Sequence, residues 1–114
     1  MRTNKMLQSM NQFTSEELNT LKNAIQYWIA NWDFECPTLF GLEKSDLVEV
    51  SANWPNALDD DTERALVSCL GSLREMLHGA SAINERAVAA TLGVSYDQAS
   101  VLCSVIHSQC QHAL

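Results

Sequence analysis

The chain of 114 residues has a formal net charge of −7, and it is 46% hydrophobic and 18% charged. These proportions are typical of one globular domain with a single core, and they exclude a disordered or collagen-like chain. No apolar run approaches the roughly 18 residues of a membrane span, so membrane insertion is not expected. An evenly acidic surface repels nucleic acid and anionic membranes; it is either an ordinary solvated surface or one suited to a basic protein partner.

Residues 1–12 carry Arg2 and Lys5 but no apolar segment after them. They therefore lack the pattern of a secretory signal, and we predict a flexible polar tail. The remainder, residues 13–114, is expected to fold as a single helical domain. Cytoplasmic residence follows as the default location.

The first long helix is predicted to begin after Thr14. The Thr14 hydroxyl can cap this helix, Glu17 completes a capping box, and Phe13 can pack against Leu18. Apolar residues then recur at helical spacing within an arc of about 100°, which predicts one buried face. They are Leu18, Leu21, Ile25, Trp28, Ile29 and Trp32.

A short helix is predicted between two prolines. Pro37 breaks the chain after Cys36, because proline is tolerated only in the first turn of a helix. Ser45 then opens a helix that must stop before Pro55. We expect Cys36, in this irregular stretch, to be the most exposed cysteine. Trp54 is either a core residue or an exposed anchor for a partner, since tryptophan dominates the central contacts of many interfaces.

A second long helix is predicted to begin within Asp59–Asp61 and to end at Gly79. Acidic residues at a helix amino terminus complement the helix dipole. These carboxylates lack the alternating spacing of a calcium loop, so they do not predict a cation site. The core stripe of this helix comprises Leu66, Cys69, Leu70, Leu73, Met76 and Leu77.

The segment from Val88 to Leu102 carries the clearest motif in the chain. Gly93 supplies a left-handed turn after one helix, and Ser95 with Gln98 forms the capping box of the next. This segment resembles the helix-turn-helix of bacterial repressors. The resemblance implies two packed helices, of which the second would contact bases in DNA. It covers only this short stretch, and a shared motif does not by itself fix a function.

Nowhere do β-branched or aromatic residues alternate with polar ones over the length of a strand. The predicted fold class is all-α, a compact bundle of about five to six helices. A shift of 52 residues superposes the apolar stripes of the two long helices and aligns Gly41 with Gly93. One interpretation is a tandem repeat, residues 13–55 and 60–112, in which each half holds a long helix and a helix-turn-helix unit.

The helix that follows Ser95 has apolar residues over roughly 200° of its circumference, which is too wide for one packing face. Its second face is expected to meet either another element or a second copy of the chain, and we favour a homodimer. The residues we expect at an interface are Trp54, Tyr96, Val101 and Val105.

The chain contains four cysteines but no Cys-x-x-Cys pair, so no disulfide framework or zinc motif is predicted. Cys103, His107 and Cys110 share one strip of the last helix and are weak candidates for binding a metal, since a structural zinc site needs a fourth ligand. The sequence contains no glycine-rich phosphate loop and no Ser/His/Asp grouping. We predict neither a cofactor nor an enzymatic activity.

The charge of the last helix decides among three functions. Asp97 is its only charged residue from Ser95 to Val105, whereas DNA binding depends on Lys and Arg. We therefore favour a non-catalytic protein-protein interaction or regulatory module with a protein partner, and nucleic acid is not expected. One alternative is a dimeric DNA-binding transcriptional regulator, and a second is a metal or small-ligand sensor. If DNA were bound, the base-reading candidates would be Ser95, Tyr96, Gln98, Ser100 and Arg86.

Overall fold

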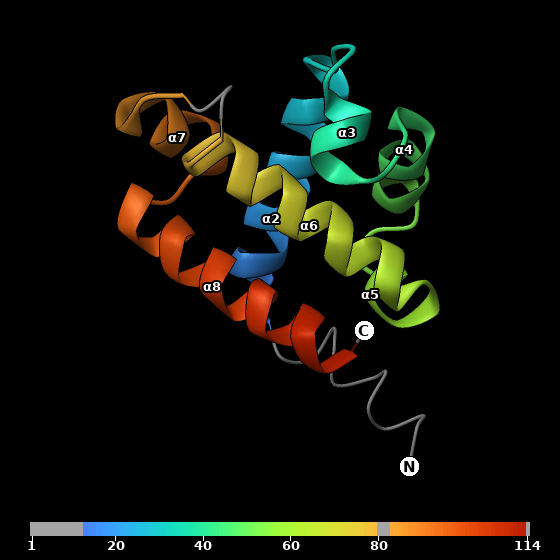
Figure 1. Ribbon diagram of the computed structural model, residues 1–114. Helices are drawn as coiled ribbons and strands as arrows, with labels where there is room; N and C mark the ends of the chain where they lie inside the picture. The colour runs from blue at the N-terminus through green and yellow to red at the C-terminus, as the bar shows by residue number, and fades with distance from the viewer. Residues whose placement is uncertain (1–12, 80–82, 114) are drawn as a thin grey trace.

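Seven helices and no strand make up the described part of the chain (Figure 1). The computed structural model describes residues 13–79 and 83–113, with side chains as far as Cys110, so the expected tail at residues 1–12 lies outside it. The predicted all-α class is confirmed. Two helices of five and four residues, α3 and α5, bring the number above the five or six expected. The helices are α2 (Ser15–Ala30), α3 (Cys36–Phe40), α4 (Lys44–Ala52), α5 (Ala57–Asp60), α6 (Thr62–Leu77), α7 (Glu85–Leu92) and α8 (Tyr96–Ala113).

Helix α2 begins as its sequence predicts. The Thr14 hydroxyl accepts a hydrogen bond from the Glu17 amide, and the Glu17 carboxylate accepts one from the Thr14 amide, which completes the capping box. The predicted apolar stripe faces the core, where Trp28 is buried. The Trp28 indole Nε1 donates to the Ser72 carbonyl of α6 at 2.9 Å. This bond satisfies the one polar group that the buried indole carries, and it joins the two long helices.

The segment after α2 differs from the prediction at Cys36, which is 1% exposed rather than the most exposed cysteine. The physical reason is that the segment is helical: α3 begins at Cys36 and accommodates Pro37 in its first turn. Cys36 and Phe40 are therefore one turn apart on the same face of α3, and both point into the core. Gly41 then ends α3 with a left-handed backbone, at a φ of 71°.

Helix α4 begins with Lys44, one residue before the predicted Ser45, because Glu43 takes the capping position. The Asp46 carboxylate accepts from the Glu43 amide at 2.8 Å. The second long helix, in contrast, begins at Thr62, one residue after the predicted Asp59–Asp61. The Asp59–Asp61 run lies at the end of α5 and on the residue that precedes α6. The acidic run therefore spans the end of a short helix and the capping position of α6.

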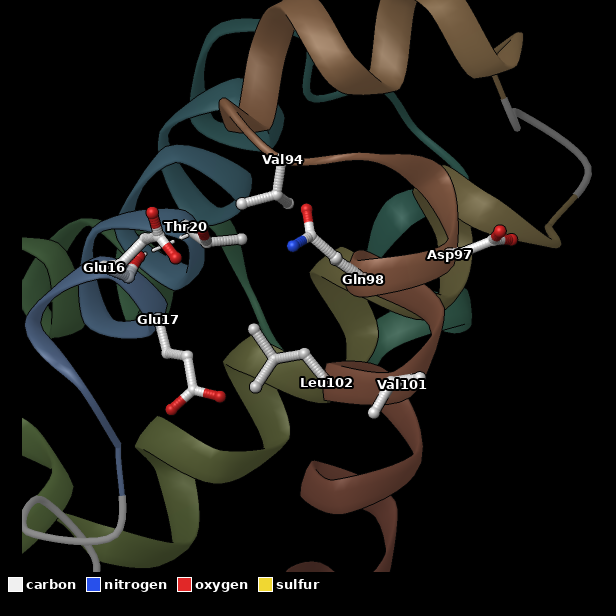
Figure 2. Close-up of a pocket in the computed structure, with 8 residues that line it drawn as sticks. All are labelled: Glu16, Glu17, Thr20, Val94, Asp97, Gln98, Val101 and Leu102. Carbon is white, nitrogen blue, oxygen red and sulfur yellow. Dashed lines mark hydrogen bonds between the residues drawn. The ribbon is translucent and has the colours of Figure 1, made fainter.

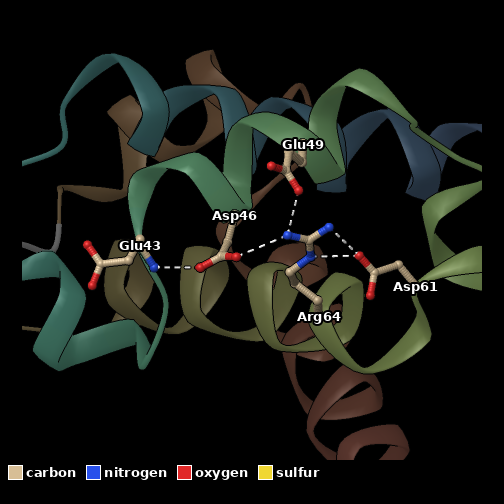
Figure 3. A network of polar contacts seen from close by, with 5 residues as sticks. All are labelled: Glu43, Asp46, Glu49, Asp61 and Arg64. Atoms are coloured by element: carbon tan, nitrogen blue, oxygen red, sulfur yellow. Dashed lines mark hydrogen bonds and ion pairs between the residues drawn. The ribbon is translucent and has the colours of Figure 1, made fainter.

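Arg64 joins α4 to the start of α6 by three ion pairs (Figure 3). Its guanidinium lies 3.0 Å from Asp46 and 2.7 Å from Glu49, both on α4, and 2.6 Å from Asp61. These carboxylates raise the pKa of Arg64 further above its ordinary value. The Glu43 amide, and after it Arg64, lowers the pKa of Asp46 below its ordinary value.

The segment that carries the motif adopts the expected local geometry. The Asn84 side chain caps α7 by accepting from the Ala87 amide at 2.8 Å, and Gly93 ends α7 with a φ of 79°. Ser95 and Gln98 cap α8 reciprocally, each accepting from the other's amide at 3.1 and 3.0 Å. This geometry does not show that the chain is related to the bacterial repressors, and that resemblance stays a prediction.

The helices enclose one core, in which α6 crosses the centre of the molecule with α2 and α8 packed against it (Figure 1). The short helices of the two halves pack crosswise: α3 lies on α6, whereas α7 lies on α2. The tandem repeat stays a prediction, but several features fit it. Gly41 and Gly93 share the left-handed conformation, and the boxes Glu43–Asp46 and Ser95–Gln98 are 52 residues apart.

Candidate functional site

Helix α8 has one buried face and one face open to solvent. Val101 and Val105, one turn apart on the open face, are 65% and 42% exposed. The buried face packs mainly on α6. The wide apolar arc of this helix therefore covers the core on one side and leaves valines unpacked on the other. The buried residues of α8 are Ala99, Leu102, Cys103, Ile106 and Cys110.

The open face of α8 carries almost no charge. From Tyr96 to Cys110 the only Asp, Glu, Lys or Arg residue is Asp97, in the first turn. The whole chain, in contrast, holds 14 acidic and 7 basic residues. Exposed apolar residues with few charges around them are typical of the centre of a protein interface. Among the described helices, α8 is the one that exposes two large apolar residues, Val101 and Val105, by more than a third.

A groove beside this face separates the first turns of α2 from those of α8 (Figure 2). It has a volume of about 330 Å³. This is the lower end of the range of roughly 300–1,000 Å³ that is usual for ligand pockets. Val94, in the turn before α8, lies at one end of the groove in Figure 2, and Leu102 lies at the other. The lining residues are Glu16, Glu17, Thr20, Val94, Asp97, Gln98, Val101 and Leu102.

The charge in the groove is negative. Glu16 and Glu17 stand on the α2 side, while Asp97 points away from the groove in Figure 2. None of the lining residues is Lys or Arg. Glu17 uses one carboxylate oxygen, Oε1, to cap α2 at 2.8 Å from the Thr14 amide. Its other oxygen and the exposed Glu16 carboxylate can accept hydrogen bonds from a ligand.

Gln98 spans the groove with its side-chain amide. Its oxygen accepts from the Ser95 amide at 3.0 Å, which fixes the orientation of the group. The nitrogen end of the amide faces α2 (Figure 2). The groove therefore combines apolar ends, a fixed hydrogen-bond donor and two carboxylates. This combination suits a ligand that carries a cation, an aliphatic chain and a carbonyl acceptor.

The residues predicted to read bases are not presented together on one surface. Ser95 and the oxygen of Gln98 are committed to the cap of α8. The Tyr96 hydroxyl donates to the Leu77 carbonyl at 3.1 Å, and its ring packs edge-on against His78. Ser100 is half-buried, and Arg86 is exposed on α7 outside the groove.

The predicted interface residues also separate into two groups. Val101 lines the groove and Val105 lies one turn beyond it, but Trp54 does neither. Trp54 is half-buried, and its Nε1 donates to the Leu18 carbonyl at 3.0 Å. That bond and its packing against the core account for Trp54 without a partner.

The residues proposed to bind a metal do not converge. Cys103 and Cys110 are buried, whereas His107 is exposed. Cys103 and His107 line a shallow hollow of about 270 Å³ between α6 and α8, which Arg74 also lines. A guanidinium at that hollow disfavours a metal cation. Among the residues that the structure describes, no three His, Cys, Asp or Glu side chains gather as metal ligands.

Sequence reasoning missed the α2 wall of the groove and one exposed aromatic residue. The sequence indicated only a capping role for Glu17 and no role for Glu16, because their proximity to α8 depends on a contact between residues about 80 positions apart. Phe34, in the loop between α2 and α3, is 90% exposed. Its only signal in the sequence is a position between Asp33 and Glu35.

Comparison of the chain with protein-family models, with curated proteins and with solved structures found no match. Among the described residues, no helix combines the length and the apolar character that crossing a membrane would require. The function must therefore be argued from the surface of α8 and the groove beside it.

Proposed function

We propose that the protein is a non-catalytic interaction module that binds a partner protein through the open face of α8 and the adjoining groove. The observation that carries this proposal is the exposure of Val101 and Val105 on a helix that contains one Asp and no Glu, Lys or Arg. Full burial of an exposed valine side chain is worth about 1.5–3 kcal/mol before ordering costs, and these two partly exposed valines can each contribute part of that. Two such residues on one rigid helix provide an apolar centre for an interface.

Binding to DNA is the alternative, and two features argue against it. The base-reading candidates Ser95, Tyr96 and Gln98 already make hydrogen bonds within the protein. The first turns of α8 also lie beside Glu16 and Glu17, whose charges would repel phosphates. Both features favour a protein partner over a nucleic acid.

The proposal is tested by crosslinking from defined positions. A photoreactive phenylalanine analogue replaces Val101, Val105 or Val48 in the full chain, which is then irradiated in nuclease-treated lysate of the native host. Val48 on α4 is the matched control, because its exposed fraction of 44% is similar to that of Val105. We expect one defined protein adduct from positions 101 and 105 and none from position 48.

Two results would overturn the interaction module. Adducts of equal yield from all three positions would mean that the face of α8 has no special role. Adducts to nucleic acid from positions 101 and 105 in untreated lysate, and none to protein, would support the DNA-binding alternative.

A further inference from the structure

We propose that the groove between α2 and α8 binds one basic side chain, Arg or Lys, of a peptide segment on the partner protein. This inference rests on the proposed function and adds the chemistry of the contact. The open face of α8 would supply the apolar area, while the groove would supply selectivity for a positive charge.

The first step of the argument is charge. The groove is lined by Glu16 and Glu17 on α2 and by no Lys or Arg, in a chain of net charge −7. A cation entering the groove is attracted by both glutamates, and the closest groups contribute most. An acidic or phosphorylated segment would be repelled by the same residues.

The second step is shape and polarity. Between the carboxylates and α8 the groove offers the aliphatic ends of Val94 and Leu102 and the methyl group of Thr20 (Figure 2). Arg and Lys bury their methylene stems against such surfaces while their charged ends reach polar groups. The cavity of about 330 Å³ is small, which suits one long side chain rather than a helix.

The third step concerns the peptide backbone. The Gln98 amide is oriented by its bond to Ser95, and its nitrogen faces α2 (Figure 2). That nitrogen can donate to a backbone carbonyl next to the basic side chain. A free organic cation lacks this carbonyl, so a peptide should bind more tightly than an amine of the same charge.

The test uses a set of synthetic decapeptides that differ only in a central residue between two leucines: Arg, Lys, norleucine or Glu. Binding to the full chain is followed in low salt by NMR shifts of the Val94 and Leu102 methyl groups and of the Gln98 side-chain amide. We expect shifts with Arg and Lys, weaker shifts with norleucine, which keeps the stem without the charge, and none with Glu.

Two double variants separate the groove from general electrostatics. Glu16→Gln with Glu17→Gln removes both groove charges, and glutamine at position 17 still completes the capping box of α2. We expect it to weaken binding of the Arg peptide about fivefold, to the level of the norleucine peptide. The control, Glu63→Gln with Glu85→Gln, removes two exposed charges from the first turns of α6 and α7 and should leave binding unchanged within about twofold.

Each remaining outcome is decisive. Equal weakening by both double variants, or equal binding of n-butylguanidinium, which carries the same single charge, and the Arg peptide, would overturn the groove while leaving the α8 face to the crosslinking test. If none of the four peptides binds, the groove proposal is also overturned. If Arg2→Gln with Lys5→Gln shifts the same resonances in the free protein, the chain's own amino-terminal segment occupies the groove, and the proposal of an external partner is wrong.

Discussion

At the scale of single residues, a glycine sets how closely α3 approaches α6. A side-chain carbon added at Gly71 would lie 2.7 Å from the Phe40 ring. That ring also packs edge-on against Trp28, with ring centres 5.6 Å apart, so it has little freedom to move away. Gly71 therefore provides the space that lets an aromatic residue of α3 join the core.

We expect Gly71→Ala to destabilise the protein. Overpacking of a core costs about 1–3 kcal/mol, while the better helix propensity of alanine returns about 1 kcal/mol. The sign of the change is the test. In a Phe40→Leu background the ring is absent, and the same substitution should become neutral or stabilising. Urea unfolding of the original protein, Gly71→Ala, Phe40→Leu and the double variant gives the free energy of unfolding of each. Equal destabilisation in both backgrounds would show that the Phe40 ring is not the obstacle.

Burial also governs the cysteines. All four lie in the core, and burial raises the pKa of each thiol, so little thiolate forms near neutral pH. We expect iodoacetamide to label each cysteine at pH 8 at least tenfold more slowly in the folded protein than in urea, with Cys69, the most deeply buried, the slowest. Labelling quantified by mass spectrometry of each cysteine peptide tests this. Cys36 reacting as fast in the folded protein as in urea would restore the sequence-based view that it is exposed.

Residue patterns predicted local structure well where the determinants are close in sequence. The caps at Thr14 and Gly93 depend on residues within a few positions, and both formed as expected. Cys36 and Trp54 were harder, because their burial depends on which distant helix covers them. A single sequence carries no signal of that contact. For the same reason, Glu16 and Glu17 were absent from the predicted site residues: a single sequence does not show that they lie near α8.

At the scale of elements, Arg64 and its three carboxylates fix α4 against the start of α6 (Figure 3). Pairs at this degree of exposure stabilise a protein only modestly one by one. Asp46 contributes twice, since it accepts from the Glu43 amide and also from Arg64. Both interactions favour its ionised form, which is why its pKa is lowered.

This lowered pKa predicts a pH-dependent contribution to stability. A carboxyl whose pKa is lower in the folded state stabilises the protein above its unfolded pKa, near 3.8, and loses that effect as the pH falls through the folded pKa. Asp46→Asn should therefore cost about 0.5–1 kcal/mol at pH 7 and almost nothing at pH 2. Urea unfolding from pH 7 to 2 measures the difference between the two proteins.

The control for this experiment is Glu63→Gln, which neutralises an exposed carboxylate in the first turn of α6 that has no ion pair in the described part of the chain. Its difference from the original protein should stay small at every pH. If the Asp46→Asn difference did not shrink at low pH, the cost would come from packing or capping geometry rather than from ionisation.

At the scale of the whole molecule, periodicity in the sequence predicted the fold class because every long helix carries an apolar stripe. The tandem repeat stays a prediction, which rests on the 52-residue offset that aligns both the stripes and the glycine turns. The crosswise packing of α3 on α6 and of α7 on α2 could not be read from the stripes, because a stripe does not identify the helix that will cover it. The groove depends on that packing and was therefore not predicted.

The charge of the whole chain separates the two partners that the face of α8 could bind. In a homodimer, two chains of charge −7 repel each other, so added salt should strengthen association by screening that repulsion. A basic partner is attracted, so salt should weaken its binding. We predict that any self-association through α8 increases between 50 and about 500 mM salt, where the screening length falls from above 10 Å to below 5 Å. Light scattering on the original chain and on Val101→Asp measures the extent of self-association at each salt concentration. A dimer that weakens with salt would contradict the argument from net charge, and one that persists in Val101→Asp would place the contact on another face of the molecule.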